Sequence, residues 1–118
     1  MVAWTEEEEL ALVVAYDNVR ANGAGRGRRG VITWATVLAE FSQLVGGTRR
    51  SCDSLSHKYS DLLSKCQTFE NCFQEMVRQF PDNDEQTRIQ FAHIEYASET
   101  GADFPYVSAW QWLRPRLN

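Results

Sequence analysis

The spacing of apolar side chains most constrains how this chain folds, because large apolar residues recur every three or four positions along nearly all of its length. The pattern is strongest after Thr33, a residue type that caps helices, and its members are Trp34, Val37, Leu38, Phe41, Leu44 and Val45. A repeat near 3.6 residues predicts an amphipathic helix, and no segment alternates with the two-residue period of a strand. We therefore expect an all-α protein.

Capping residues and helix breakers divide the chain into further helices. Thr5 followed three residues later by Glu8 has the pattern of a capping box, which predicts a helix that ends near Arg20 or Ala21. A third helix is expected to begin at Thr48 or Ser51. The tail is expected to hold an aromatic helix over 69–80, an acidic helix from Asp82 or Asp84 to about Thr100, and a short helix from Ser108 to Leu113. The stop signals are Gly46, Gly47, Pro81, Gly101 and Pro115.

The apolar stripes predict which face of each helix is inward. The first helix carries a short stripe at Leu10, Val13, Val14 and Asp17. The third carries Cys52, Leu55, Tyr59, Leu62 and Cys66, so its opposite face is polar and partly basic. The apolar residues of the acidic helix spread over two faces, and we expect both to be covered.

Charge divides the chain into two parts. The net charge is −4, from 12 Lys and Arg against 16 Asp and Glu. Residues 1–65 hold eight of each sign, whereas residues 66–118 hold four basic and eight acidic residues. Two surfaces with different partners are expected. The sequence shows no apolar run long enough for a membrane span and no basic leader, so neither membrane association nor secretion is expected. Its three irregularly spaced cysteines suit a reducing compartment.

Three phrases resemble the Myb/SANT family, in which each of three helices contributes one large aromatic residue. They are Trp4-Thr5-Glu6-Glu7-Glu8 with Leu10, Trp34 with Val37 and Phe41, and Arg50 with Leu55, Lys58, Tyr59 and Leu62. The likeness covers about residues 3–65 and is greatest to the trihelix and transposon-borne branches. It implies a three-helix, helix-turn-helix module over 1–65 that acts in the nucleus in transcription regulation.

The tail carries a second resemblance, in Phe104-x-Tyr106, Ala109-Trp110 and Leu113-Arg114. These phrases are similar to plant Myb-like proteins related to Harbinger-type transposons, which often carry a no-apical-meristem-associated region. The likeness implies a helical tail over 66–118 that packs on the module or on a protein partner, such as a transposase-like or chromatin protein. The expected contact residues are Phe73, Met76, Tyr106, Trp110 and Trp112.

Basic residues near the third helix indicate duplex DNA as the other partner. With the apolar stripe inward, Arg50, Ser54, His57 and Lys58 are expected to face outward and reach base edges in the major groove. An arginine-rich loop would contact phosphates. Asp53 either accepts a hydrogen bond from cytosine or tethers an arginine, and tethering is favoured. The full predicted DNA-binding set is Arg26, Arg28, Arg29, Arg49, Arg50, Ser54, His57, Lys58 and Lys65.

Other classes of function have less support. The alternative to DNA binding is a SANT-type adaptor that binds only protein, with the basic residues forming a solvated face. No catalytic constellation is evident, so an enzyme is not expected, and no cofactor is predicted. Gly25-x-Gly27-x-x-Gly30 matches a dinucleotide fingerprint but follows a helix rather than a strand. Cysteine and histidine residues lack the paired spacing of a zinc site, so no metal is predicted.

Overall fold

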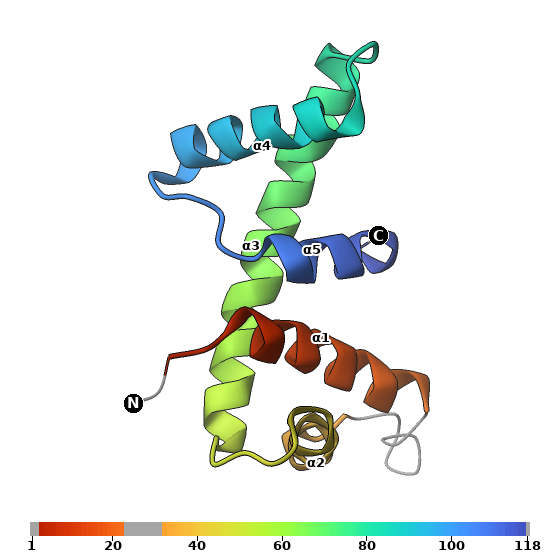
Figure 1. Cartoon of the computed structure of the whole chain (residues 1–118), viewed down its shortest axis with the longest axis vertical. Coiled ribbons are helices and arrows are strands. Elements are labelled where there is room, and N and C mark those ends of the chain that lie inside the picture. Colours follow the sequence, from red (N-terminus) through yellow and green to blue (C-terminus); the bar gives the residue numbers. More distant parts are fainter. Residues whose placement is uncertain (1–2, 23–31, 118) are drawn as a thin grey trace. The chain divides into compact units, whose positions relative to one another are not determined.

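The structure, a computed structural model, describes residues 3–22 and 32–117, and within these ranges every regular element is helical. The prediction of an all-α protein is confirmed. Figure 1 shows the helices, which are followed by a short 3₁₀ turn, Arg114–Arg116. Their bounds are α1, Glu6–Ala21; α2, Trp34–Val45; α3, Cys52–Gln79; α4, Glu85–Thr100; and α5, Val107–Leu113.

Most of the predicted helix ends are confirmed by their capping contacts. The Thr5 hydroxyl accepts from the Glu8 backbone N–H at 3.1 Å while Glu8 Oε1 accepts from the Thr5 N–H at 3.0 Å, which completes the capping box. Thr33 caps α2 and Asp84 caps α4 in the same way, each by accepting from the backbone N–H three residues on. Helices α2 and α4 end at Gly46 and Gly101, whose backbones are in the left-handed conformation. A residue with a side chain would be strained in that conformation.

Helix α3 corrects the predicted arrangement, because the third helix and the aromatic helix over 69–80 are one continuous helix of 28 residues. No glycine or proline interrupts residues 63–69, and the buried stripe continues through them as Leu62, Cys66, Phe69, Phe73 and Met76. The chain divides into two compact units, residues 1–61 (unit 1) and 62–118 (unit 2), so the division falls within α3. The sequence placed it between residues 65 and 66.

Unit 1 contains α1, α2 and the first turns of α3, whose apolar faces meet in one core (Figure 1). The core face of α1 consists of Leu12, Ala15 and Val19, and Val13 is also buried. The predicted stripe of Leu10, Val13, Val14 and Asp17 is therefore wrong except at Val13, because it passed over the alanines that share the inward face. In α2, Leu44 is 46% exposed, although the pattern predicted it to be buried.

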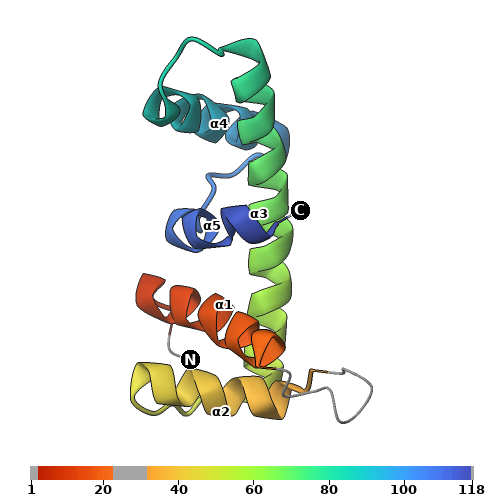
Figure 2. The same cartoon turned by 90° about the vertical axis from the view of Figure 1, so that its right-hand side faces the viewer.

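Unit 2 contains the rest of α3, together with α4 and α5 (Figure 2). Aromatic rings fill its core. Phe69 of α3 stacks on Phe104, with ring centroids 4.1 Å apart, and meets Trp110 of α5 edge-on at 4.8 Å. Helix α4 buries one face, through Ile89, Ala92 and Tyr96. Its other face leaves Ile94 69% exposed, so the expectation that both faces are covered is wrong.

Candidate nucleic-acid interface

The aromatic residues of unit 1 form two groups within its core. Trp34 and Tyr59 pack edge to face at 5.6 Å, and Tyr16 lies against both, stacking on Tyr59 at 4.3 Å. Trp4 packs separately on Phe41 of α2 at 5.7 Å. These rings pack on the core of the unit, where they order it. Tyr16 was missed because the sequence search sought one aromatic residue in each helix.

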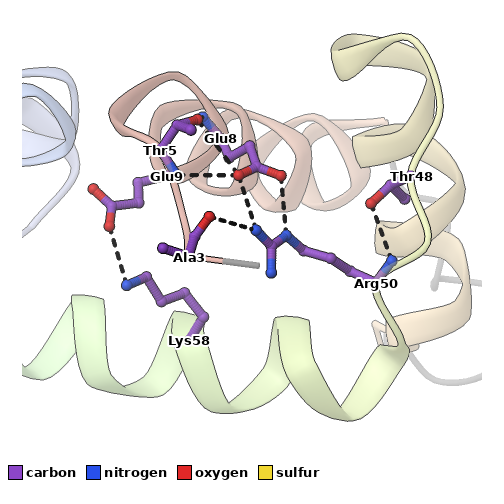
Figure 3. Close-up of polar contacts among 7 residues, drawn as sticks. All are labelled: Ala3, Thr5, Glu8, Glu9, Thr48, Arg50 and Lys58. Carbon is purple, nitrogen blue, oxygen red and sulfur yellow. Dashed lines mark hydrogen bonds and ion pairs between the residues drawn. The ribbon is translucent and has the colours of Figure 1, made fainter. Parts of the chain in front are cut away.

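Arg50 is the most strongly bound cation of unit 1. Its Nε donates to Glu8 Oε2 at 3.0 Å, and its Nη2 donates to Glu8 Oε1 at 2.9 Å and to the Ala3 carbonyl at 3.1 Å (Figure 3). The guanidinium also lies 4.0 Å from the centre of the Trp4 ring, which places a cation over a π face. The side chain is only 12% exposed. The hydrogen bonds from Arg50 lower the pKa of Glu8, although partial burial opposes the shift.

Lys58 completes this arrangement from the first turns of α3. Its Nζ lies 3.0 Å from Glu9 Oε2 (Figure 3). The same atom lies 5.7 Å from the centre of the Trp4 ring. We call Trp4, Glu8, Glu9, Arg50 and Lys58 the Trp4 cage. The expectation that Arg50 and Lys58 face outward is wrong. The sequence analysis overlooked that two glutamates at the start of α1 would meet these cations inside the unit.

The outward face of α3 in unit 1 carries different residues. Asp53, His57, Ser60 and Asp61 are exposed, at positions i, i+4, i+7 and i+8, and we call this set the outer face. His57 belongs to the predicted DNA-binding set, Asp53 was considered as a base contact or an arginine tether, and Asp61 was expected on the polar face of this helix, so only Ser60 is new. The inward stripe of Leu55, Tyr59 and Leu62 already fixes the opposite side of the helix, so extending that phase would have found Ser60.

The connection between α2 and α3 carries Arg49, which is exposed as predicted. The Ser51 hydroxyl accepts from the Ser54 backbone N–H at 3.1 Å, so Ser51 caps the start of α3. Residues 47–51 line a surface hollow of about 540 Å³ together with Glu8 and Ser54. Ser54 is half-buried and turned toward this hollow, beside the outer face.

Four further residues of the predicted set lie elsewhere. Lys65 is half-buried in unit 2, where its Nζ lies 5.8 Å from the centre of the Tyr106 ring. It is therefore outside the part of α3 that belongs to unit 1. The remaining three, Arg26, Arg28 and Arg29, lie outside the described residues.

The predicted partner-contact residues of the tail are mostly core residues. Trp110 is fully buried, and Phe73, Met76 and Tyr106 are nearly so. The indole Nε1 of Trp110 donates to Glu70 Oε1 at 2.9 Å, so even its polar atom is satisfied within unit 2. Assigning these four side chains to a partner surface is a mistake, because the tail uses them to build its own core. Only Trp112 is partly exposed, and the Arg116 guanidinium lies 3.7 Å from its ring.

The two cysteines of unit 2 lie in its interior. Cys66 and Cys72 are buried, and burial together with Glu99 and Glu95 raises the pKa of Cys72 to about 11, so this thiol is protonated at neutral pH. Across residues 3–22 and 32–117, no group of three metal-binding side chains comes together. None of the helices in these ranges is both long and apolar enough to span a bilayer.

No protein-family model, curated protein or solved structure matches the chain.

Proposed function

We propose that residues 1–61 are a Myb/SANT-like helix-turn-helix module that binds duplex DNA in the nucleus, with the outer face of α3 in the major groove. The observation that carries the proposal is the polarity of this face. Asp53, His57, Ser60 and Asp61 are exposed and hydrophilic, whereas every apolar side chain of this part of α3 is at least partly buried. A helix of this kind, preceded by a short connection and a second helix, fits the major groove as a recognition helix.

The length of the outer face matches a short DNA site. Asp53 and Ser60, on either side of His57, lie seven residues apart, or about 10 Å along the axis at 1.5 Å per residue. That distance corresponds to roughly three base-pair steps of 3.4 Å. Histidine donates to guanine acceptors when suitably protonated, and serine accepts or donates to several bases. The face therefore suits a contact with about three base pairs.

Phosphate contact falls to residues beside the outer face. Arg49 is exposed at the start of α3, and in the described part of the chain its guanidinium has no ion pair or hydrogen bond. Arg50 and Lys58 are compensated by Glu8 and Glu9 and support the fold instead. Among the described residues of unit 1 few cations are left for phosphate contacts, and we expect a single module to bind DNA with modest affinity and a shallow salt dependence.

The test is a fluorescence anisotropy titration of the full chain with random and selected duplexes over a series of salt concentrations. Arg49→Ala should weaken binding to all duplexes equally and reduce the salt slope by about one unit. His57→Ala should cost about 1–3 kcal/mol on a selected site and relax its specificity. Arg78→Ala is the matched charge control, because Arg78 is exposed in unit 2 and paired with Glu75. An absence of duplex binding at low salt would refute the proposal.

A second candidate, a SANT-type adaptor that binds only protein, is favoured by one observation. Asp53 and Asp61 place two carboxylates on the outer face, where they oppose a phosphate backbone. Two carboxylates on such a face also suit a basic peptide segment. Binding of the chain to a basic peptide, lost in the Asp53→Asn, Asp61→Asn double variant and accompanied by no duplex binding, would select this function.

A further inference from the structure

The carboxylate of Asp53 lies in the first turn of α3, where its charge suits the positive end of the helix dipole, and within the described residues its side chain has no hydrogen-bond or ion-pair partner. Its favoured interpretation from sequence was to tether a nearby arginine. Arg50 instead binds Glu8 in a bidentate pair and is covered by Trp4. In the described ranges, neither Arg49 nor Asp53 has an ion pair or side-chain hydrogen bond, so no arginine is tethered there.

Asp53 differs in this respect from the other carboxylate of the outer face. Asp61 has an interaction within the fold, whereas Asp53 is exposed in the first turn of α3, one helical turn before His57. The N-terminal residues of a recognition helix are those that reach base edges. An exposed carboxylate at this place repels phosphates, so it weakens general DNA binding unless a base-edge donor compensates for it.

We infer that Asp53 sets the sequence preference of the module by accepting a hydrogen bond from the exocyclic amine of cytosine, which favours a C·G pair at one position of the site. This inference rests on the proposed DNA-binding function. Cytosine N4 is the donor that the major groove offers to a carboxylate at a C·G pair. His57, at i+4 on the same face, is placed for the neighbouring base pair. Thymine presents only an acceptor and a methyl group there, so it is excluded by the unpaired carboxylate.

The chemistry of this contact predicts how the preference changes on substitution. Asparagine carries a donor and an acceptor at the same place, and it pairs with adenine N6 and N7. Asp53→Asn should therefore change the preferred base at one position from cytosine to adenine, by on the order of tenfold in relative affinity. Asp53→Ala should lose the preference at that position without gaining another. Both variants should bind random duplex somewhat more tightly than the parent, since a negative charge is removed.

The experiment is selection of sites from a randomised duplex library by the full-length chain and its Asp53→Asn, Asp53→Ala and Asp82→Asn variants. Asp82 is an exposed aspartate of unit 2, so Asp82→Asn makes the same charge change outside the interface and should leave the selected site unchanged. Circular dichroism confirms that each variant remains helical. A cytosine position that becomes adenine only in Asp53→Asn supports the inference.

Two other outcomes would overturn the inference about Asp53, and they can be distinguished from each other. If the parent chain selects a site but Asp53→Asn selects the same one, Asp53 does not contact a base, and the DNA-binding proposal stands. If the parent chain selects nothing and binds no duplex at low salt, the proposed function fails and the inference fails with it.

Discussion

Units 1 and 2 each place an arginine over a tryptophan, but the two arrangements have different consequences. In unit 1, Arg50 covers the partly buried Trp4 and is held by both oxygens of Glu8. In unit 2, Arg114 lies 4.7 Å from the centre of the Trp110 ring, and its own partner Glu85 is largely exposed. Trp110 itself is fully buried. In unit 1 the arginine makes the central contacts, whereas in unit 2 the buried ring of Trp110 makes them.

This difference shows why neither a basic cluster nor a group of aromatic residues identifies an interface. Arg50 and Lys58, which were expected to contact DNA, are held within unit 1, and Trp110, which was expected to contact a partner, is buried in unit 2. The polar outer face of α3 remains exposed. Its residues are of types that the amino-acid composition does not mark as interface residues. Substitutions in the two units should therefore differ in size and in what they affect.

The largest effect is expected at the centre of unit 2. Trp110→Ala removes a fully buried ring that contacts Phe69 and Phe73, and it leaves Glu70 without its indole partner. Loss of an aromatic core residue costs about 3–5 kcal/mol of unfolding free energy. Urea denaturation followed by circular dichroism measures it. Trp112→Ala, at a half-exposed position, is the control and should cost less than about 1.5 kcal/mol. Equal losses would contradict the assignment of Trp110 to the core.

The second effect tests the Trp4 cage. Arg50→Ala removes two hydrogen bonds to a charged partner and the cover over Trp4, which should cost unit 1 about 2 kcal/mol of stability. Arg50→Lys should recover only part of this, because an ammonium cannot form the bidentate pair. Denaturation followed by tryptophan fluorescence measures both variants.

DNA titration of the same variants separates a supporting role from a direct contact. If Arg50 supports the fold, Arg50→Ala should leave the salt slope unchanged under conditions in which the variant is folded. If Arg50 contacted a phosphate directly, Arg50→Ala would lower the slope by about one unit with little loss of stability. That result would mean that Arg50 contacts DNA rather than stabilising unit 1, and the proposed difference between the two units would be wrong.

The sequence predicted the helices better than their side-chain contacts, for physical reasons. Capping boxes and left-handed glycines act over three or four residues, so Thr5, Thr33, Asp84, Gly46 and Gly101 could be identified without knowledge of the fold. The outward or inward orientation of Arg50 and Lys58 depends on glutamates more than forty residues away, which no local pattern records. The third helix and the aromatic helix over 69–80 were predicted separately although no glycine or proline lies between them, and they form the single helix α3.

A smaller effect should appear in the pH dependence of unit 1. Because Arg50 holds the pKa of Glu8 below its ordinary value of 4.5, the folded state binds fewer protons at Glu8 than the unfolded state does near that pH. The contribution of Glu8 is therefore fully present above about pH 4.5 and is lost as the pH falls through the lower pKa of the folded state. Stability curves of the parent chain and Glu8→Gln should converge in acid. A constant difference between them would show that the pair does not stabilise the fold by charge.

The smallest effect is expected on the outward side of α4. Ile94→Ser replaces a side chain that is 69% exposed, so it should change the unfolding free energy by no more than about 0.5 kcal/mol. Ile89→Ser is the matched control on the same helix, and because Ile89 is buried it should cost several times more, about 2–5 kcal/mol. Urea denaturation at two protein concentrations measures both. A large and concentration-dependent loss in Ile94→Ser would mean that another copy of the chain covers this face. Unit 2 would then contribute an intermolecular surface, and its contrast with unit 1, whose exposed face is polar, would concern the kind of partner rather than stability alone.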